Sequence, residues 1–290
     1  MRWVWRCALL AVFACHWAAA PAAAETVHSA EGSFRLLFLR DGGVDYARLA
    51  EYADSYEVWM RPPPGGLLAS LSLVFALPTL VNELAGIPKE ALAARSEPDR
   101  VAFWINAYNT MTVDLIVREW HARKGRLKSI KEIPSPWSRP KWTVAGRSVS
   151  LDEVEHDILR KEFHEPRIHL ALVCASKSCP ALRSLEVRGD SLDAQLDSAA
   201  REFVLDPSRN DFTPRDGAIR ISKIFDWYGK DFVGVYSDPT FERLYGREMG
   251  AVLAYVARFL PAETVAALRT KRARVTYLPY DWSLNVAPSQ

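Results

Sequence analysis

One short segment constrains the folding of this chain more than any other. Residues 167–182 have the sequence RIHLALVCASKSCPAL. The apolar run at 168–174 predicts a short buried strand, and the small and polar residues after it predict a turn that contains Cys179. Such an arrangement is common where a nucleophilic thiol is presented, and also where two nearby cysteines form a disulfide. The main functional question is which of these two the sequence encodes.

The N-terminal residues predict the compartment of the protein. Arg2 and Arg6 precede an apolar run at 7–17, and small residues follow up to Ala24. A basic region, a short apolar region and a small-residue cleavage site are typical of a secretory signal peptide. We therefore expect residues 1–24 to be a signal peptide that is cleaved near Ala24. The mature protein is then periplasmic or secreted, with no transmembrane span.

Cleavage would change the charge and the cysteine content. The chain has 37 Lys+Arg and 35 Asp+Glu, a formal net charge of +2. Loss of the two signal-peptide arginines brings that charge to zero. A neutral protein has no net field that attracts a polyanion, so we expect no nucleic acid partner. Cys7 and Cys15 are also lost, which leaves Cys174 and Cys179 in an oxidising compartment.

Residues 25–290 are predicted to form a single globular α+β domain. The apolar and charged fractions of the full 290-residue sequence, 49% and 25%, are those of a soluble domain. Helical patterns outnumber strand patterns, and the strands are scattered, so we expect a helix-rich domain around a small, mainly antiparallel sheet. The expected helices lie at 45–60, 67–84, 99–123, 150–163 and 191–205, with more up to Leu268. The expected strands are a hairpin at 142–150, then 168–174, a strand near Ile219, and 274–278.

Two asparagines on the helix at 99–123, which Asp99 is expected to cap, are candidate site residues. Asn106 and Asn109 lie one helical turn apart and flank the apolar stripe of this helix. They either satisfy nearby backbone groups, since a buried amide must be hydrogen-bonded, or act as an orienting amide or oxyanion donor.

Two histidines are candidate general bases, because unperturbed histidine titrates near neutral pH. His156 lies in the helix that a capping box predicts at 150–163. His169 lies inside the predicted strand, on the face opposite to Cys174. It could therefore reach Cys179 in the turn, but not Cys174 unless a bulge intervenes. For each histidine the alternative is a structural role in the core.

Two roles remain possible for Cys174 and Cys179: a disulfide between them, or a nucleophile. Their C-x4-C spacing differs from the C-x-x-C of dithiol oxidoreductases. A disulfide is possible if the turn brings the two Cα atoms within about 7 Å. Cys179 is the better nucleophile candidate, because the nearby Lys177 would lower the pKa of its thiol. Too few His and Cys residues lie nearby for a metal site, and we find no cofactor-binding motif, so neither is expected.

Five motifs of this chain resemble those of bacterial secreted members of the domain of unknown function 547 family. They are FWINAYN at 103–109, LDEVEHDILR at 151–160, the segment at 167–182, KIFDWYGKDF at 223–232 and YDWSLN at 280–285. The motifs follow the order expected for that family and span most of the chain beyond residue 24. The resemblance implies a family but no activity, because the function of the family is unknown.

The candidate residues define one functional hypothesis and one alternative. The hypothesis is an envelope hydrolase or acyl transferase for amide or ester bonds, with Cys179 as the nucleophile. The base would be His156 or His169, within about 4 Å of that sulfur. Asp281 or an asparagine would orient the imidazole of this base. Backbone N–H groups of the turn would hold the oxyanion. The alternative is a non-catalytic envelope module with a Cys174–Cys179 disulfide, which binds a ligand or protein through exposed tryptophans. These tryptophans are Trp137, Trp142, Trp227 and Trp282.

Overall fold

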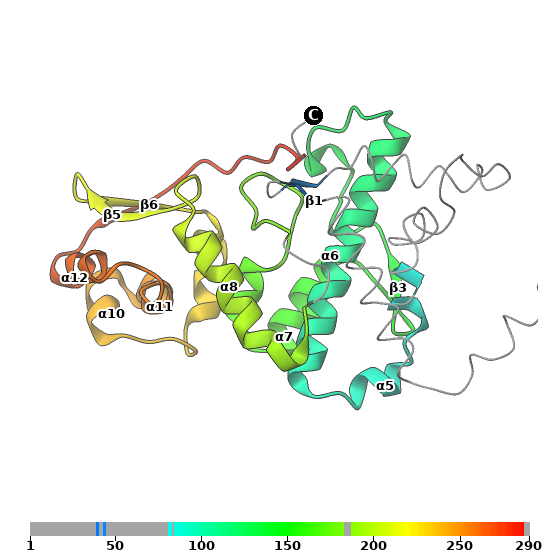
Figure 1. The fold of residues 1–290 in the computed structure, drawn as a ribbon, viewed down its shortest axis with the longest axis horizontal. Coiled ribbons are helices and arrows are strands. Elements are labelled where there is room, and N and C mark those ends of the chain that lie inside the picture. The colour runs from blue at the N-terminus through cyan, green and yellow to red at the C-terminus, as the bar shows by residue number, and fades with distance from the viewer. Residues whose placement is uncertain (1–38, 41–42, 45–80, 83, 183–186, 287–290) are drawn as a thin grey trace, which may run out of the picture.

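The computed structural model describes residues 39–40, 43–44, 81–82, 84–182 and 187–286 (Figure 1). The predicted signal peptide, the predicted helix at 45–60 and most of the one at 67–84 lie outside these residues. Within the described part the fold is helix-rich α+β with mainly antiparallel strand pairs, as the sequence predicts. The single-domain assignment of residues 25–290 stays a prediction.

The described elements are short apart from α6 and α8. The α-helices are α5 (Lys89–Ala93), α6 (Glu97–Ala122), α7 (Arg160–Glu162), α8 (Leu192–Leu205), α9 (Ile224–Tyr228), α10 (Pro239–Tyr245), α11 (Arg247–Val256) and α12 (Ala262–Thr270). The other helical segments are η2 (Ile130–Glu132), η3 (Glu153–Leu159), η4 (Pro166–Leu170), η5 (Gly189–Ser191) and η6 (Gly229–Phe232). The strands are β1 (Leu39–Arg40), β2 (Gly43–Val44), β3 (Trp142–Val144), β4 (Arg147–Val149), β5 (Asp211–Arg215), β6 (Ala218–Ile221) and β7 (Arg274–Tyr277).

The long helix α6 begins at Glu97, and its N-cap is Ser96 rather than the predicted Asp99. The Ser96 hydroxyl accepts a hydrogen bond from the Asp99 N–H at 3.3 Å and donates one to the Asp99 carboxylate at 2.6 Å. This cap satisfies an N–H group that has no partner inside the helix. The predicted apolar stripe is buried along its whole length: Val101, Trp104, Ile105, Tyr108, Met111, Leu115 and Ile116.

The predicted hairpin and the capping box after it are confirmed. β3 pairs with β4 around Ala145 and Gly146, which both have positive φ. The Ser150 N–H donates to the Glu153 carboxylate at 2.6 Å, and the Glu153 N–H donates to Ser150 Oγ at 3.2 Å. The helix ends at Glu162, and its central segment η3 is a π-helix. Single π-helical turns are frequent at functional sites.

The predicted strand at 168–174 is wrong. Pro166–Leu170 form the 3-10 helix η4, and residues 171–174 continue without regular secondary structure. A proline opens η4, where its fixed φ favours a helical turn and its missing N–H costs nothing. A short apolar run cannot by itself distinguish a buried strand from a buried helical turn. The strand alternation that separated His169 from Cys174 therefore does not apply.

The remaining strand predictions and the α8 helix are confirmed. β6 is the central strand of a three-stranded sheet, antiparallel to β5 and parallel to β7. Helix α8 begins one residue later than predicted. Helices α10, α11 and α12 lie together beside this sheet, at the opposite end of the molecule from the β3–β4 hairpin (Figure 1).

Buried apolar side chains form two clusters, one around α6 and the β3–β4 hairpin and the other around α11 and the three-stranded sheet. Segment η4 joins them, because Ile168 packs in the first cluster and Leu170 in the second. Residues 278–286, here called the C-terminal strap, return from β7 towards α6 (Figure 1). There the Leu284 N–H donates to the Lys128 carbonyl oxygen at 2.9 Å. Side chains distant in sequence therefore meet where the two clusters join.

Candidate functional site

A cavity of about 320 Å³ contains most of the candidate residues. Its walls come from α6, η3, α9, the segment after η4 and the C-terminal strap. The lining residues are Tyr108, Trp137, Asp152, Glu155, His156, His169, Leu172, Cys174, Cys179, Ile224, Trp227, Tyr228, Tyr280 and Trp282. Because both cysteines and both candidate histidines line it, this cavity is the candidate site.

Cys174 has the surroundings of a reactive thiol. Its side chain is partly buried, and its Sγ lies 3.1 Å from Ser176 Oγ and 3.3 Å from the Tyr280 hydroxyl. Burial raises the pKa of this thiol, but side-chain hydrogen bonding with Cys179, Ser176 and Tyr280 outweighs burial and lowers the pKa to about 7. The thiolate is the nucleophilic form of cysteine, so Cys174 is the better nucleophile of the pair at neutral pH.

Cys179 has a structural position, contrary to the prediction. Its buried sulfur accepts a hydrogen bond from the Cys174 N–H at 2.8 Å and donates one to the Leu172 carbonyl oxygen at 3.7 Å. Burial and the neighbouring Cys174 raise the pKa of its thiol, and the exposed Lys177 does not offset this shift. Both cysteines are free thiols in this structure, so the disulfide that the sequence leaves open is not formed.

Asn109 holds the backbone between η4 and the first cysteine. Its amide N–H donates to the Ala171 carbonyl oxygen at 3.0 Å, and its Oδ1 accepts from the Val173 N–H at 2.9 Å. Asn106 makes the same pair of bonds with the carbonyl and N–H groups of Val187. Neither asparagine lines the cavity. Both therefore satisfy backbone groups, and Asn109 does so beside the site.

His169 lies at the centre of a buried acid–base chain. Its side chain is 1% exposed, Nε2 donates to Asp231 at 2.8 Å, and Nδ1 lies 3.8 Å from Glu155 Oε1. The Tyr108 hydroxyl donates to Glu155 at 3.1 Å, and the Tyr228 ring stacks on the imidazole with the centroids 3.8 Å apart. Burial lowers the pKa of His169, although Asp231 and Glu155 oppose that shift. The neutral imidazole is therefore favoured at neutral pH.

Arg160 connects the acid–base chain around His169 to His156. Its guanidinium donates to both Asp231 oxygens at 2.6 and 2.8 Å and to His156 Nδ1 at 3.1 Å. A guanidinium cannot accept, so Nδ1 is the acceptor and the His156 proton lies on Nε2, which is 4.0 Å from Asp152. Burial raises the pKa of Asp231, but His169 and Arg160 hold it well below its usual range. His156 is therefore arranged as a hydrogen-bond donor rather than as a base.

Two expected contacts are not formed among the described residues. No hydrogen bond joins His156 or His169 to either cysteine sulfur. Asp281 lies outside the cavity, where its carboxylate accepts from the Ser283 N–H at 2.8 Å and closes a turn. The carboxylate that orients an imidazole is instead Asp231, and its one signal in the sequence was its place in the motif at 223–232.

The predicted backbone oxyanion hole is not formed either. The N–H groups of Lys177 and Ser178 donate to carbonyl oxygens of the C-terminal strap at 2.9 and 3.2 Å. The Cys179 N–H donates to the Ser176 carbonyl oxygen at 3.1 Å. These three donors stabilise the turn itself. A negative charge in the cavity would therefore be stabilised by side-chain donors.

Aromatic side chains form the outer wall of the cavity. Trp282 stacks on Trp227, with the centroids 5.9 Å apart and the planes at 27°, and packs edge-on against Trp137 at 5.8 Å. Tyr280 lies 4.6 Å from Trp282, and Trp227 is 38% exposed. Trp142, the fourth tryptophan of the binding hypothesis, is a core residue. The wall suits an apolar or flat part of a ligand.

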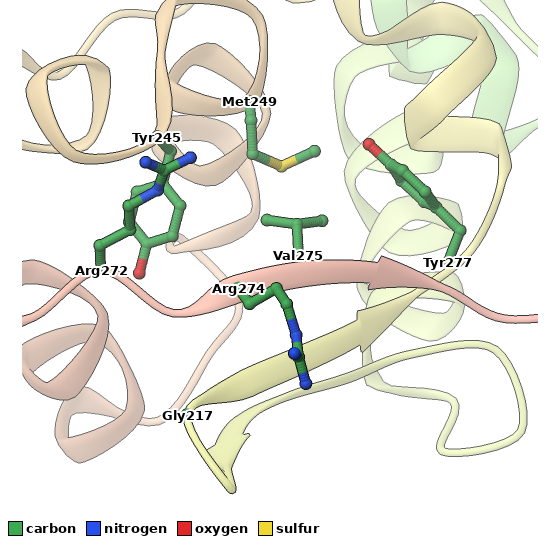
Figure 2. Close-up of a pocket in the computed structure, with 7 residues that line it drawn as sticks. All are labelled: Gly217, Tyr245, Met249, Arg272, Arg274, Val275 and Tyr277. Carbon is green, nitrogen blue, oxygen red and sulfur yellow. The ribbon is translucent and has the colours of Figure 1, made fainter.

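A larger cavity of about 500 Å³ lies beside β7 (Figure 2) and shares no lining residue with the first cavity. It is lined by Gly217, Tyr245, Met249, Arg272, Arg274, Val275 and Tyr277. In Figure 2 the Met249 and Val275 side chains face each other, while Arg274 points away from them. This lining contains no cysteine, histidine or carboxylate. We therefore assign the candidate chemistry to the smaller cavity.

Neither a metal cluster nor a membrane-spanning helix occurs among the described residues. That part of the chain contains no group of three or more His, Cys, Asp and Glu side chains that could hold a metal ion. Nor does any helix described in the structure have the length and apolar character needed to cross a membrane.

The fold and the cavity define an α+β protein in which an acidified thiol lies beside an imidazole–carboxylate chain. The family described as "Protein of unknown function, DUF547" matches residues 92–204, which include α6, η3, η4 and both cysteines. The matched segment, 113 of the 290 residues, is therefore similar to this family. No curated protein and no solved structure matches the chain. Asp231 and five of the lining residues lie beyond the matched span: Ile224, Trp227, Tyr228, Tyr280 and Trp282.

Proposed function

We propose that this protein is a thiol-dependent hydrolase or acyl transferase for amide or ester bonds in the cell envelope, with Cys174 as its nucleophile. The observation that supports this most is the lowered pKa of Cys174 inside a cavity that also contains carboxylates and imidazoles. Strongly shifted pKa values are common at functional sites. The envelope location follows from the predicted signal peptide, so the mature protein should begin near Glu25; a mature chain with Met1 intact would contradict it.

The first step is attack by the Cys174 thiolate on the acyl carbon of the substrate. The new S–C bond forms as the carbonyl π bond opens, which places a negative charge on the acyl oxygen. His156 Nε2–H is the donor assigned to this charge. Collapse of the tetrahedral intermediate breaks the C–N or C–O bond and leaves the acyl group on Cys174 as a thioester.

The leaving amine or alcohol takes a proton as it departs. We assign this transfer to the carboxylate of Glu155, which lines the cavity and lies 3.8 Å from His169 Nδ1. It carries to the leaving group the proton that the Cys174 thiol gives up when it ionises. His169 and Asp231 act through Glu155 as positioning residues, because the imidazole is almost fully buried. In the second step water, or an acceptor nucleophile, returns a proton to Glu155 and attacks the thioester. The Cys174 thiolate is then released.

The binding-module alternative retains one observation in its favour, the aromatic wall of Trp137, Trp227 and Trp282. Stacked tryptophans at a cavity mouth suit recognition of a ligand as well as of a substrate. The two functions therefore differ in the fate of the bound molecule. Only the hydrolase forms a covalent bond between that molecule and Cys174.

Trapping of the acyl intermediate tests the proposal. The protein is treated with p-nitrophenyl acetate, and nitrophenolate release and peptide masses are measured. We expect one acetyl group on Cys174 in the wild type and none in Cys174→Ser. Cys179→Ser is the matched control; it retains a hydrogen-bond donor beside Cys174 and should still be acetylated there. Acetylation of Cys179, or equal turnover by Cys174→Ser, would rule the proposal out, and binding without a covalent adduct would favour the binding module.

A further inference from the structure

We infer that Cys174 and Cys179 form a reversible oxidation site, in which Cys174 reacts with a hydroperoxide and Cys179 then closes a disulfide. The inference rests on the contacts between these two residues. It goes beyond the proposed acyl chemistry and does not depend on it.

The sulfur of Cys179 is held close to the backbone of Cys174. The Cys174 N–H donates to Cys179 Sγ at 2.8 Å. Because an N–Cα bond is about 1.46 Å long, the Cys179 sulfur lies within about 4.3 Å of the Cys174 Cα atom. In a disulfide this sulfur is joined to the same Cα atom through Cβ, Sγ and an S–S bond of about 2.05 Å, a path of three bonds that reaches this distance. Rotation of the Cys174 side chain, with a local adjustment of the turn, is therefore enough to bring the two sulfurs together.

The conformation of the turn explains why cysteines with a C-x4-C spacing meet. Ala175 has a φ of 59°, in the left-handed region, so the chain reverses direction immediately after Cys174. The Arg209 guanidinium then donates to the carbonyl oxygens of Lys177 and Cys179 at 2.9 and 3.2 Å. Arg209 thus holds the turn in the position that places the second thiol against the first.

The two thiols have different access to an oxidant. Both cysteines line the cavity, but Cys174 is partly exposed, whereas Cys179 is only 4% exposed. A peroxide reacts with an accessible thiolate, and a buried neutral thiol is inert. Cys174 is therefore the residue that the hydroperoxide oxidises. Cys179 is the resolving thiol.

The chemistry balances with one hydroperoxide per disulfide. The Cys174 thiolate attacks the terminal peroxide oxygen of ROOH; the S–O bond forms, the O–O bond breaks, and the departing alkoxide takes a proton and leaves as ROH. The Cys179 thiol then attacks the sulfenic acid of Cys174, so that the S–S bond forms, the S–O bond breaks and water leaves. The two thiols supply the two electrons. A dithiol reductant reverses the reaction by thiol–disulfide exchange.

The experiment oxidises the reduced, full-length mature protein with hydrogen peroxide and reads the products by intact mass and peptide mapping. We expect a Cys174–Cys179 disulfide, seen as the loss of two hydrogen atoms and reversed by dithiothreitol. Cys179→Ser cannot close the bond and should accumulate a sulfenic acid on Cys174, which dimedone traps. Cys174→Ser should form neither product.

Three outcomes would overturn the inference: a sulfenic acid that forms first on Cys179, no dimedone adduct in Cys179→Ser, or a wild-type protein that peroxide leaves as the dithiol. Peptide mapping of the wild type decides the matter even if a variant fails to fold. The readout needs no acyl substrate, so the two proposals fail separately. If the protein forms the disulfide but no thioester, this inference stands and the proposed hydrolase is refuted. If it forms the thioester but no disulfide, the proposed hydrolase stands and this inference is refuted.

Discussion

Replacement of Tyr280 by phenylalanine tests the origin of the acidity of Cys174. The Tyr280 hydroxyl lies 3.3 Å from Cys174 Sγ and 3.2 Å from Ser176 Oγ. The change removes one donor to the sulfur and leaves the aromatic ring in place, so its packing against Trp282 is retained. The pKa of Cys174 should therefore rise.

The size of the shift follows from the strength of the lost hydrogen bond. A hydrogen bond to a charged group contributes about 1.5–3 kcal/mol, and one pKa unit corresponds to about 1.36 kcal/mol. Sulfur is a weak acceptor, so we expect the lower end, a rise of about one unit. From about 7 in the wild type, the pKa of Cys174 should reach about 8. At pH 7 the thiolate fraction would fall from about one half to about one tenth.

The assay is the rate of Cys174 alkylation by iodoacetamide as a function of pH, with the modified residue assigned by peptide mass. Because the thiolate is the reacting form, the midpoint of the rate profile reports the pKa of Cys174. The rate profiles of wild type and Tyr280→Phe should converge at high pH, where Cys174 is ionised in both proteins. Tyr277→Phe is the matched control, since it removes a phenol from β7 that does not line the cavity.

Two results would refute this reasoning. An unchanged midpoint in Tyr280→Phe would mean that the phenol does not stabilise the thiolate. An equal shift in Tyr277→Phe would mean that the change acts through the fold rather than through the hydrogen bond to Cys174.

Three further substitutions are tested by urea unfolding. Asp231→Asn removes a partly buried ion pair, so it should lower the free energy of unfolding at pH 7 by about 2–4 kcal/mol. Because the folded pKa of Asp231 lies below its unfolded value, this loss of stability should persist above about pH 4 and fade as the pH falls towards the folded pKa. A loss that grew on acidification would contradict the assignment. Asn109→Ala leaves two backbone groups without partners, costs about 1–3 kcal/mol and should slow Cys174 alkylation; Asn106→Ala is the control, with a similar cost but unchanged alkylation. Ser150→Ala breaks the capping box, costs about 1 kcal/mol and should leave alkylation unchanged.

The local elements of the fold could be predicted because neighbouring residues determine them. The Ser150–Glu153 capping box and the turn at Ala145 and Gly146 depend on residues at most a few positions apart, and both are present. The strand at 168–174 could not be predicted correctly, because its apolar residues fit a buried helical turn equally well and packing between the two clusters decided between them.

Only part of the cavity lining could be named from the sequence. Of the six candidate residues, His156, His169 and Cys179 line the cavity, whereas Asn106, Asn109 and Asp281 do not. Which thiol is acidic depends on donors such as Tyr280, 106 positions from Cys174 along the chain, and no local pattern reports that distance. The carboxylate partner of His169 is Asp231, 62 positions away, for the same reason.

The C-terminal strap has a consequence for the life of the protein before it is folded. Tyr280 and Trp282 are among the last described residues of the chain, yet they complete the walls around Cys174. A polypeptide leaves the ribosome N-terminus first, and contacts across a long stretch of sequence close late because loop closure costs entropy. A nascent or unfolded chain therefore has Cys174 with the pKa of an ordinary thiol, about 8.5. The thiol reaches its lowered pKa only after residues 278–286 have been synthesised and the strap has docked, so until then Cys174 has the lower reactivity of an ordinary thiol.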